Sequence, residues 1–281
     1  MVALGKRGDE QRESNMGRET HLIPISWEKA TVRWQQVSDN EWAPVTYDFP
    51  VGAPETGKVE RINPMPFTHT RQYQKDAFND NFDESNLNLE WNFRRVPQAN
   101  TFSLAARSGH LRLYAKPEVI DNRVQASLIG FRQRESDFEY TASIYYQPKK
   151  EGEEAGMSLF QKDNNYINFT LTKEQGLMIL KVILKDPKEE PKILKQEILS
   201  NYEGEILLRV ISKDHQYQYQ YSLDQGQKYF TFMSSKGDLI LSHRTGSYTG
   251  AYLGLYATGN GKGTKAFMDV DWVFYQGFPR S

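Results

Sequence analysis

The feature that most constrains the fold of this chain is a series of short segments in which apolar and polar residues alternate. The alternation is clear in residues 111–115, 166–172 and 267–275, and residues 206–211 form a further short apolar run. A period of two is typical of a strand with one buried face, whereas an amphipathic helix repeats every ~3.6 residues. Turn-forming pairs such as Asp163-Asn164 separate these segments. Because no convincing helical pattern lies between them, the sequence predicts an antiparallel β-sandwich.

The same alternation predicts which side chains share a face. One face of residues 166–172 carries Ile167, Phe169 and Leu171, and one face of residues 267–275 carries Met268, Val270, Trp272 and Phe274. About 200 residues follow residue 75, which is the scale of a jelly roll rather than the roughly 100 residues of an immunoglobulin domain. The expected fold is therefore an all-β jelly roll over residues 76–277.

The region before the sandwich divides into two segments. Residues 1–35 contain two apolar runs, Val2-Ala-Leu4 and Leu22-Ile-Pro-Ile25, with a charged loop between them. They would form a hairpin, and an isolated hairpin is marginally stable. Residues 36–75 are rich in proline and glycine, which predicts an extended linker.

Composition excludes several classes of protein. The net charge is −1, so the chain lacks the basic footprint of a nucleic-acid-binding domain. It contains no cysteine and therefore no disulfide framework. No apolar run approaches the ~20 residues that a membrane span requires, and the charged N-terminus does not resemble a signal peptide. These observations leave the compartment open.

Standard catalytic motifs are absent from the sequence. There is no Gly-x-Ser-x-Gly elbow, no His-Glu-x-x-His pair and no EF-hand loop. The five histidines are scattered without the spacing of metal ligands. The sequence alone therefore predicts no catalytic residue.

Residues 216–221 alternate glutamine and tyrosine, which places Tyr217, Tyr219 and Tyr221 on one face of a strand. A sheet lined by these side chains would bind a glycan through ring stacking and hydrogen bonds. In the alternative interpretation the tyrosines pack in the core and the glutamines face water, because aromatic side chains dominate core burial.

Four aspartates lie on the first and last predicted strands of the sandwich, namely Asp80, Asp83, Asp269 and Asp271. Terminal strands adjoin in many sandwiches, and Ca²⁺ takes six to eight oxygen ligands. These residues would therefore hold a structural Ca²⁺ ion, or they are charged residues at the edge of a sheet.

Two segments near the start of the chain, Met1–Arg7 and Gly17–Trp27, resemble the closing blade of the five-bladed β-propeller of glycoside hydrolase family 43. The later motifs follow the order of the C-terminal β-sandwich of its β-xylosidases: Asp80-Asn-Phe-Asp83, Leu87-Asn-Leu-Glu-Trp91-Asn-Phe-Arg94, Gly109-His-Leu-Arg-Leu113, Phe131-Arg-Gln-Arg134, Tyr219-Gln-Tyr-Ser222, Thr249-Gly-Ala-Tyr-Leu-Gly254 and Asp269-Val-Asp-Trp272.

The resemblance implies a concanavalin A-like sandwich at residues 76–277, a linker at 36–75 and a remnant of the closing propeller blade at 1–35. It implies an accessory domain of a β-xylosidase or α-L-arabinofuranosidase acting on xylan or arabinoxylan, partnered by a catalytic propeller that precedes it or is a separate chain. The family's three catalytic acids lie on earlier blades, so none is assigned here and the chain alone is expected to be inactive.

Two further expectations concern carbohydrate. Relatives often read Ala-Arg-Arg-Gln where this chain has Phe131-Arg-Gln-Arg134, and in some of them the loop before that motif sends an aromatic side chain into the propeller's pocket. Here that loop reads Asp121-Asn-Arg-Val124, so any contact with a xylo- or arabino-oligosaccharide would fall to Asn122 or Arg123. The alternative function is a free-standing carbohydrate-binding module that uses the glutamine and tyrosine face.

Overall fold

The computed structural model describes residues 1–6, 16–60, 63 and 77–278. These residues form two compact units. Residues up to 60, except 16 and 17, make up the first unit, and residues 77–278 with 16 and 17 make up the second. The described residues contain no α-helix, only strands and three short 3-10 turns.

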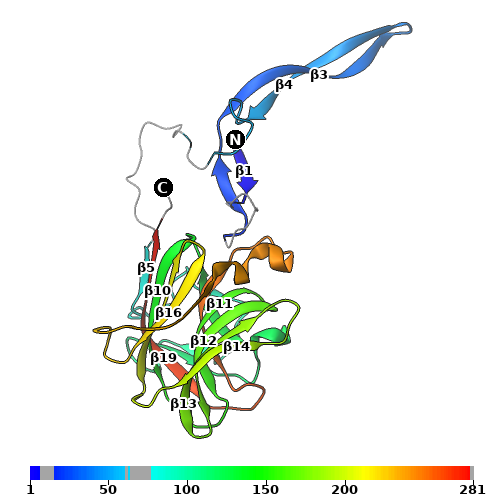
Figure 1. Ribbon diagram of the computed structural model, residues 1–281. Coiled ribbons are helices and arrows are strands. Elements are labelled where there is room, and N and C mark those ends of the chain that lie inside the picture. Colours follow the sequence, from blue (N-terminus) through cyan, green and yellow to red (C-terminus); the bar gives the residue numbers. More distant parts are fainter. Residues whose placement is uncertain (7–15, 61–62, 64–76, 279–281) are drawn as a thin grey trace. The chain divides into compact units, whose positions relative to one another are not determined.

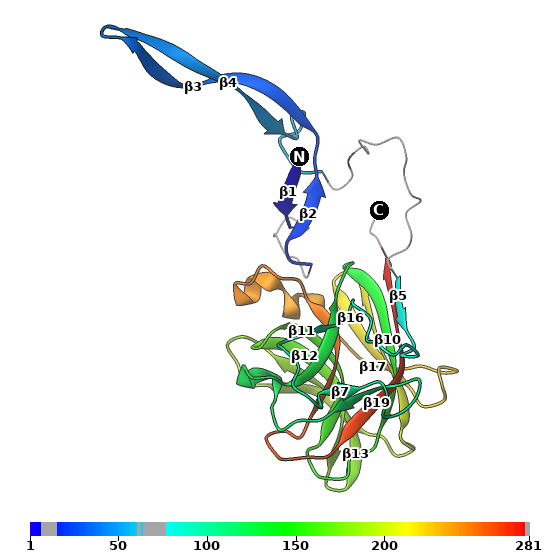
Figure 2. The same cartoon turned by 180° about the vertical axis from the view of Figure 1, so that it is seen from behind.

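The second unit is a sandwich of two sheets that lie face to face (Figures 1 and 2). The strands of the eight-stranded sheet are, in spatial order, β17 (Phe230–Lys236), β16 (Gln216–Ser222), β15 (Glu205–Lys213), β10 (Asp137–Tyr146), β19 (Phe267–Phe278), β8 (Leu111–Tyr114) and β7 (Phe102–Ser103), with β5 (Ala77–Asp80) also paired to β19. The strands of the seven-stranded sheet are, in spatial order, β14 (Lys192–Ile198), β13 (Leu177–Lys185), β12 (Asn165–Glu174), β11 (Glu154–Lys162), β18 (Tyr252–Thr258), β9 (Ser127–Arg132) and β6 (Asn92–Phe93). The 3-10 turns are η1 (Ile120–Asn122), η2 (Gly237–Ile240) and η3 (Ser242–Thr245).

This architecture confirms the all-β sandwich predicted from the alternating segments. All strand pairs are antiparallel, and the segments expected at 111–115, 166–172, 206–211 and 267–275 form β8, β12, β15 and β19. The core lies between the two sheets, and the side chains at alternate positions of each strand point into it.

Phe131 is the centre of the largest aromatic group in the core. Its ring is fully buried. The ring centroid lies 4.9 Å from that of Phe78, 5.7 Å from Trp91, 5.4 Å from Tyr140 and 5.3 Å from Tyr275. Three of these four contacts are edge-to-face, an arrangement that brings the positive edge of one ring to the negative face of another.

A β-bulge in β19 corrects one expectation. Ser143 pairs with Trp272, but the next residue, Ile144, pairs with Val270, so Asp271 is an extra residue in β19. A bulge shifts the alternation by one residue.

The shift changes which side chains of β19 are buried. Met268 and Val270 face the core as predicted, but beyond the bulge the core residues are Val273 and Tyr275. Trp272 and Phe274 therefore lie on the outer face, and the prediction that all four residues share one face is wrong for this pair.

A buried glutamate fixes two loops at one end of the sandwich. Glu153 is 3% exposed and accepts hydrogen bonds from the backbone N–H groups of Lys149 and Lys150 and from the hydroxyl of Thr264. Burial alone raises the pKa of a carboxyl group, but these hydrogen bonds outweigh it, and the pKa of Glu153 is lowered from its ordinary value.

The first unit consists of two antiparallel strand pairs. Strand β1 (Val2–Gly5) pairs with β2 (Glu19–Leu22), and β3 (Ile25–Ser38) pairs with β4 (Glu41–Gly52). Residues 41–52 were expected in an extended linker, so the structure corrects that expectation. The prolines suggested a break in regular structure, but both strands of a two-stranded sheet are edges, and edge strands tolerate proline.

Three tryptophans share one face of the β3–β4 hairpin. Trp27 lies opposite Pro50 and Trp34 opposite Pro44, and both prolines share a face of β4 with Trp42. The side chains of Trp27, Trp34 and Trp42 are 66%, 61% and 58% exposed, respectively. We call this surface the tryptophan face.

Candidate functional site

The tyrosines of β16 belong to the core. Tyr217 and Tyr219 are 0% exposed, and the ring of Tyr219 lies 5.5 Å from that of Phe169 across the sandwich. Tyr221 is partly buried and stacks on Phe230. The alternative interpretation, in which the tyrosines fill the core, is therefore the one that the structure adopts. Because two of the three rings have no exposed surface, this face of β16 does not provide a glycan platform.

The opposite face of β16 carries the glutamines. Gln220 accepts a 2.8 Å hydrogen bond from Nε of Arg209 and donates to Gln218 at 2.6 Å. The guanidinium of Arg209 also lies 3.4 Å from the ring centroid of Tyr229. These contacts tie the outer face of β15 and β16 to the loop that follows β16.

The loop expected to approach the propeller's pocket is held in place at η1. Asn122 accepts a 2.9 Å hydrogen bond from the backbone N–H of Val119, and Arg123 takes the left-handed conformation with φ 54°. Arg94 donates to the carbonyl of Ile120, a residue with no exposed surface. Both Asn122 and Arg123 are exposed. Their contact with an oligosaccharide stays a prediction.

The four aspartates do not gather at one point. The carboxylate of Asp80 accepts hydrogen bonds from the backbone N–H of Phe82 at 2.9 Å and from Nε1 of Trp91 at 2.7 Å. Asp80 pairs with Val273, four residues along β19 from Asp269, which corresponds to roughly 13 Å at ~3.3 Å per residue.

The two aspartates of β19 also differ from each other. Asp269 is 1% exposed, and Arg112 binds both of its oxygens at 2.7 and 2.8 Å. Asp271 is exposed at the bulge, 3.9 Å from Nε2 of His110, and Asp83 is exposed in the loop after β5. Within the described residues, no group of three or more His, Cys, Asp or Glu side chains is arranged to hold a metal ion. A calcium ion at these four residues therefore stays a prediction without a ligand cage to support it.

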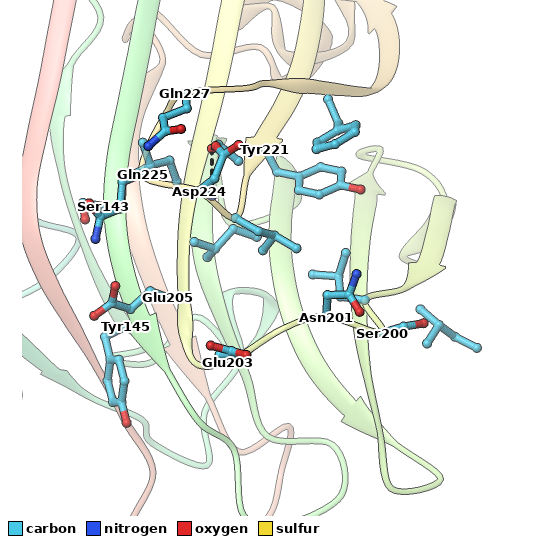
Figure 3. Close-up of a pocket in the computed structure, with 17 residues that line it drawn as sticks. Ser143, Tyr145, Ser200, Asn201, Glu203, Glu205, Tyr221, Asp224, Gln225 and Gln227 are labelled. Carbon is cyan, nitrogen blue, oxygen red and sulfur yellow. Dashed lines mark hydrogen bonds between the residues drawn. The ribbon is translucent and has the colours of Figure 1, made fainter.

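A hollow lies at one end of the eight-stranded sheet, and Figure 3 shows the side chains that line it. It encloses about 980 Å³ between β10, β15 and the loops that follow β14 and β16. Gln225, Ser143, Glu205 and Tyr145 lie along one of its sides. A pocket of this size is at the upper end of the ~300–1,000 Å³ typical of ligand sites.

A second hollow continues from the first across the outer face of the sheet. It encloses about 450 Å³ and shares Ser143, Tyr145, Glu205, Leu207 and Gln225 with the first. Arg107, His110, Ile144, Asp271 and Trp272 complete its lining. We call this second hollow the Trp272 groove.

Sequence reasoning missed the Trp272 groove because it placed Trp272 on the same face as Met268 and Val270. The segment Asp269-Val-Asp-Trp272 alternates regularly and gives no sign of a bulge. The register of the neighbouring strand is needed to locate it.

The fold defines the second unit as a concanavalin A-like β-sandwich. The family described as "Beta xylosidase C-terminal Concanavalin A-like domain", with the short name GH43_C2, matches residues 79–276. The chain therefore belongs to this family of glycoside hydrolase family 43 C-terminal domains.

Curated relatives and solved structures agree with this assignment. The chain is 26% identical over 277 residues to "Non-reducing end alpha-L-arabinofuranosidase BoGH43B" of Bacteroides ovatus. It is 25% identical over 276 residues to "Xylosidase/arabinosidase" of Butyrivibrio fibrisolvens. The solved structure of the Bacteroides ovatus xyloglucan-locus GH43B superimposes with a TM-score of 0.82 at 24% identity, covering 99% of this chain and 51% of that one.

The chain spans about half the length of the relatives that it matches. The alignments cover 98% and 97% of this chain but 48% of each of the two curated proteins. Among the described residues, no helix has the length and apolar character needed to cross a bilayer.

Proposed function

We propose that this chain is the C-terminal accessory β-sandwich of a family 43 glycoside hydrolase that degrades xylan or arabinoxylan. The observation that carries the proposal is the family match over residues 79–276, combined with relatives that are about twice as long and are named as arabinosidases or xylosidases. The catalytic propeller would correspond to the half of those relatives that this chain does not match. The sandwich would support that propeller and shape the rim of its substrate pocket.

The tryptophan face favours a partner domain for the first unit. A two-stranded hairpin is marginally stable in water, because it cannot bury enough apolar surface by itself. Trp27, Trp34 and Trp42 each leave more than half of their side chain exposed. Trp34 and Trp42 lie near each other on this face, with Pro44 between them, and exposed apolar side chains that gather on one face mark interaction surfaces. We therefore assign the tryptophan face to the catalytic propeller, which would extend the open edges of β3 and β4.

The decisive experiment compares this chain with the polypeptide encoded immediately upstream of it. Each would be assayed alone and after co-expression, with 4-nitrophenyl β-D-xylopyranoside and 4-nitrophenyl α-L-arabinofuranoside as substrates. We expect hydrolysis only when the upstream polypeptide is present, and none from this chain alone. Hydrolysis by this chain alone that disappears when one of its Asp or Glu residues is changed would overturn the accessory role.

The partner surface has its own test in the same co-expression. Replacing Trp27, Trp34 and Trp42 with threonine keeps a β-forming residue at each position and removes the apolar surface. We expect this triple variant to lose co-purification with the upstream polypeptide. Leu89→Thr is the matched control, because Leu89 is 98% exposed in the sandwich. Equal co-purification of the triple variant and the control would exclude the tryptophan face as the partner surface.

A further inference from the structure

The Trp272 groove arises from the sizes of neighbouring side chains on three strands. Trp272 of β19 pairs with Ser143 of β10, and Ser143 pairs with Leu207 of β15. Directly opposite residues lie side by side on the same face of a sheet. The small side chain of Ser143 therefore makes a low point between two large ones, which is the floor of the groove.

A second aromatic ring lies beside this low point. Tyr145 follows Ser143 on the same face of β10 and pairs with Asp269, so the bulge at Asp271 lies between Tyr145 and Trp272, and both side chains line the groove. One side of the Tyr145 ring contacts the guanidinium of Arg107, whose carbon lies 5.3 Å from the ring centroid. Trp272 and Tyr145 are both partly exposed, although most aromatic residues of this sheet point into the core.

The bulge at Asp271 creates this arrangement. Without the extra residue, Trp272 would share the buried face with Val270, as the plain alternation predicted. Bulges often lie next to functional sites, where they redirect a side chain. Here the bulge moves a large aromatic ring from the inner face of the sheet to the side of a surface groove.

The polar groups around the two rings include both donors and acceptors of hydrogen bonds. The hydroxyl of Ser143 lies at the floor of the groove, and the amide of Gln225, the imidazole of His110 and the carboxylates of Glu205 and Asp271 also line it. The guanidinium of Arg107 also lines the groove, and its nitrogen lies 3.4 Å from a carboxylate oxygen of Asp269. A strongly charged ligand of either sign would meet a like charge, so the groove fits a neutral ligand.

We propose that the Trp272 groove binds a neutral oligosaccharide, with the rings of Trp272 and Tyr145 stacking on sugar rings. A pyranose has faces of C–H groups that pack on an aromatic ring and an edge of hydroxyl groups that both donate and accept hydrogen bonds. The groove offers both kinds of contact within about 450 Å³, inside the usual range of ~300–1,000 Å³ for ligand sites. The choice of a hemicellulose oligosaccharide rests on the proposed function. The site would hold a polysaccharide chain near the enzyme without taking part in its cleavage.

Isothermal titration calorimetry tests this proposal on the full 281-residue chain. Xylohexaose, arabinohexaose and cellohexaose are the neutral probes, and a hexamer of galacturonic acid is the charged one. We expect at least one neutral hexamer to bind and the acidic hexamer to bind more weakly. Absence of binding by every neutral hexamer, or stronger binding of the acidic one, would overturn the proposal.

Two variants place the binding at this groove. Trp272→Ala removes one stacking surface, and Ser143→Leu fills the low point while leaving both rings in place. We expect each to weaken binding at least tenfold, equivalent to about 1.4 kcal/mol. Phe278→Ala is the matched control, because it removes an exposed aromatic ring of β19 that does not line the groove, and it should leave the affinity unchanged.

Far-ultraviolet circular dichroism would establish that each variant is folded. An unchanged affinity in folded Ser143→Leu would overturn the location of the site. Such a failure is distinguishable from failure of the accessory role, because hydrolysis in the presence of the upstream polypeptide is measured separately.

Discussion

Replacing Phe131 with alanine should destabilise the sandwich more than most single changes would. Removing a buried phenylalanine costs about 3–5 kcal/mol through lost burial and the cavity left behind. Phe131 is fully buried and contacts four aromatic rings at 4.9–5.7 Å, and each such pair contributes roughly 0.5–1.5 kcal/mol beyond its area. The change should therefore lie at the upper end, about 4–5 kcal/mol.

This loss converts into a large shift of the melting temperature. For a domain of roughly 200 residues, each kcal/mol lowers Tm by about 2–4 °C, so Phe131→Ala should lower Tm by about 8–20 °C. Thermal unfolding followed by near-ultraviolet circular dichroism measures the packing of the aromatic core directly. Leu89→Ala is the control and should change the stability by less than ~0.5 kcal/mol, because Leu89 is 98% exposed. A decrease in Tm of less than about 4 °C for Phe131→Ala would refute the central role of this ring.

Three further changes test other parts of the sandwich. A Cβ atom on Gly254 would lie 2.8 Å from the carbonyl oxygen of Ile129, so Gly254→Ala should lower the free energy of unfolding by about 1–3 kcal/mol, as measured by urea denaturation. Gly263 has open space around it, so Gly263→Ala is the control and should not lower the stability. The pKa of Glu153 is lower in the folded state than its unfolded value of about 4.3, so the ionised side chain stabilises the fold above that value, and this stability is lost as the pH falls through the folded pKa. The decrease in Tm with acid should therefore be shallower in Glu153→Gln than in the unchanged chain. Equal slopes would contradict this. Asp269→Ala should cost about 2–3 kcal/mol, less than the ~3–5 of a fully buried pair, because the side chain of its partner Arg112 is 20% exposed. Measuring this loss with millimolar Ca²⁺ and with EDTA tests the calcium prediction: a larger loss with Ca²⁺ would support an ion at Asp269, and an equal loss would count against it.

The sequence by itself determined the fold class and the family. Alternation in segments such as 166–172 survives in the structure because a strand places successive side chains on opposite faces whatever its neighbours are. Ile167, Phe169 and Leu171 are all fully buried, as that local rule predicts. The motifs from Asp80 to Trp272 identified the family that matches residues 79–276. These conclusions depend only on local geometry and on the order of motifs along the chain.

The tertiary structure decided which of the two interpretations of residues 216–221 applies. Alternation puts Tyr217 and Tyr219 on one face but does not say which face meets the second sheet. That choice depends on the strands that pack across the sandwich, where Phe169 contacts Tyr219. The proline-rich segment 41–52 was misjudged for a similar reason, because its pairing with β3 is a long-range contact that propensity alone does not predict.

The candidate site depended most on tertiary structure. A bulge is a mismatch between two strands, so it is defined by the partner as much as by the strand that contains it. The extra residue at Asp271 became evident only from the pairing of β19 with β10, and it moved Trp272 from the face of Val270 to the surface groove. Likewise, Asp269 was a candidate calcium ligand in the sequence, but the neighbouring strand β8 places Arg112 against both of its oxygens. The sequence determined where strands form, whereas the contacts between strands decided what each face is available to bind.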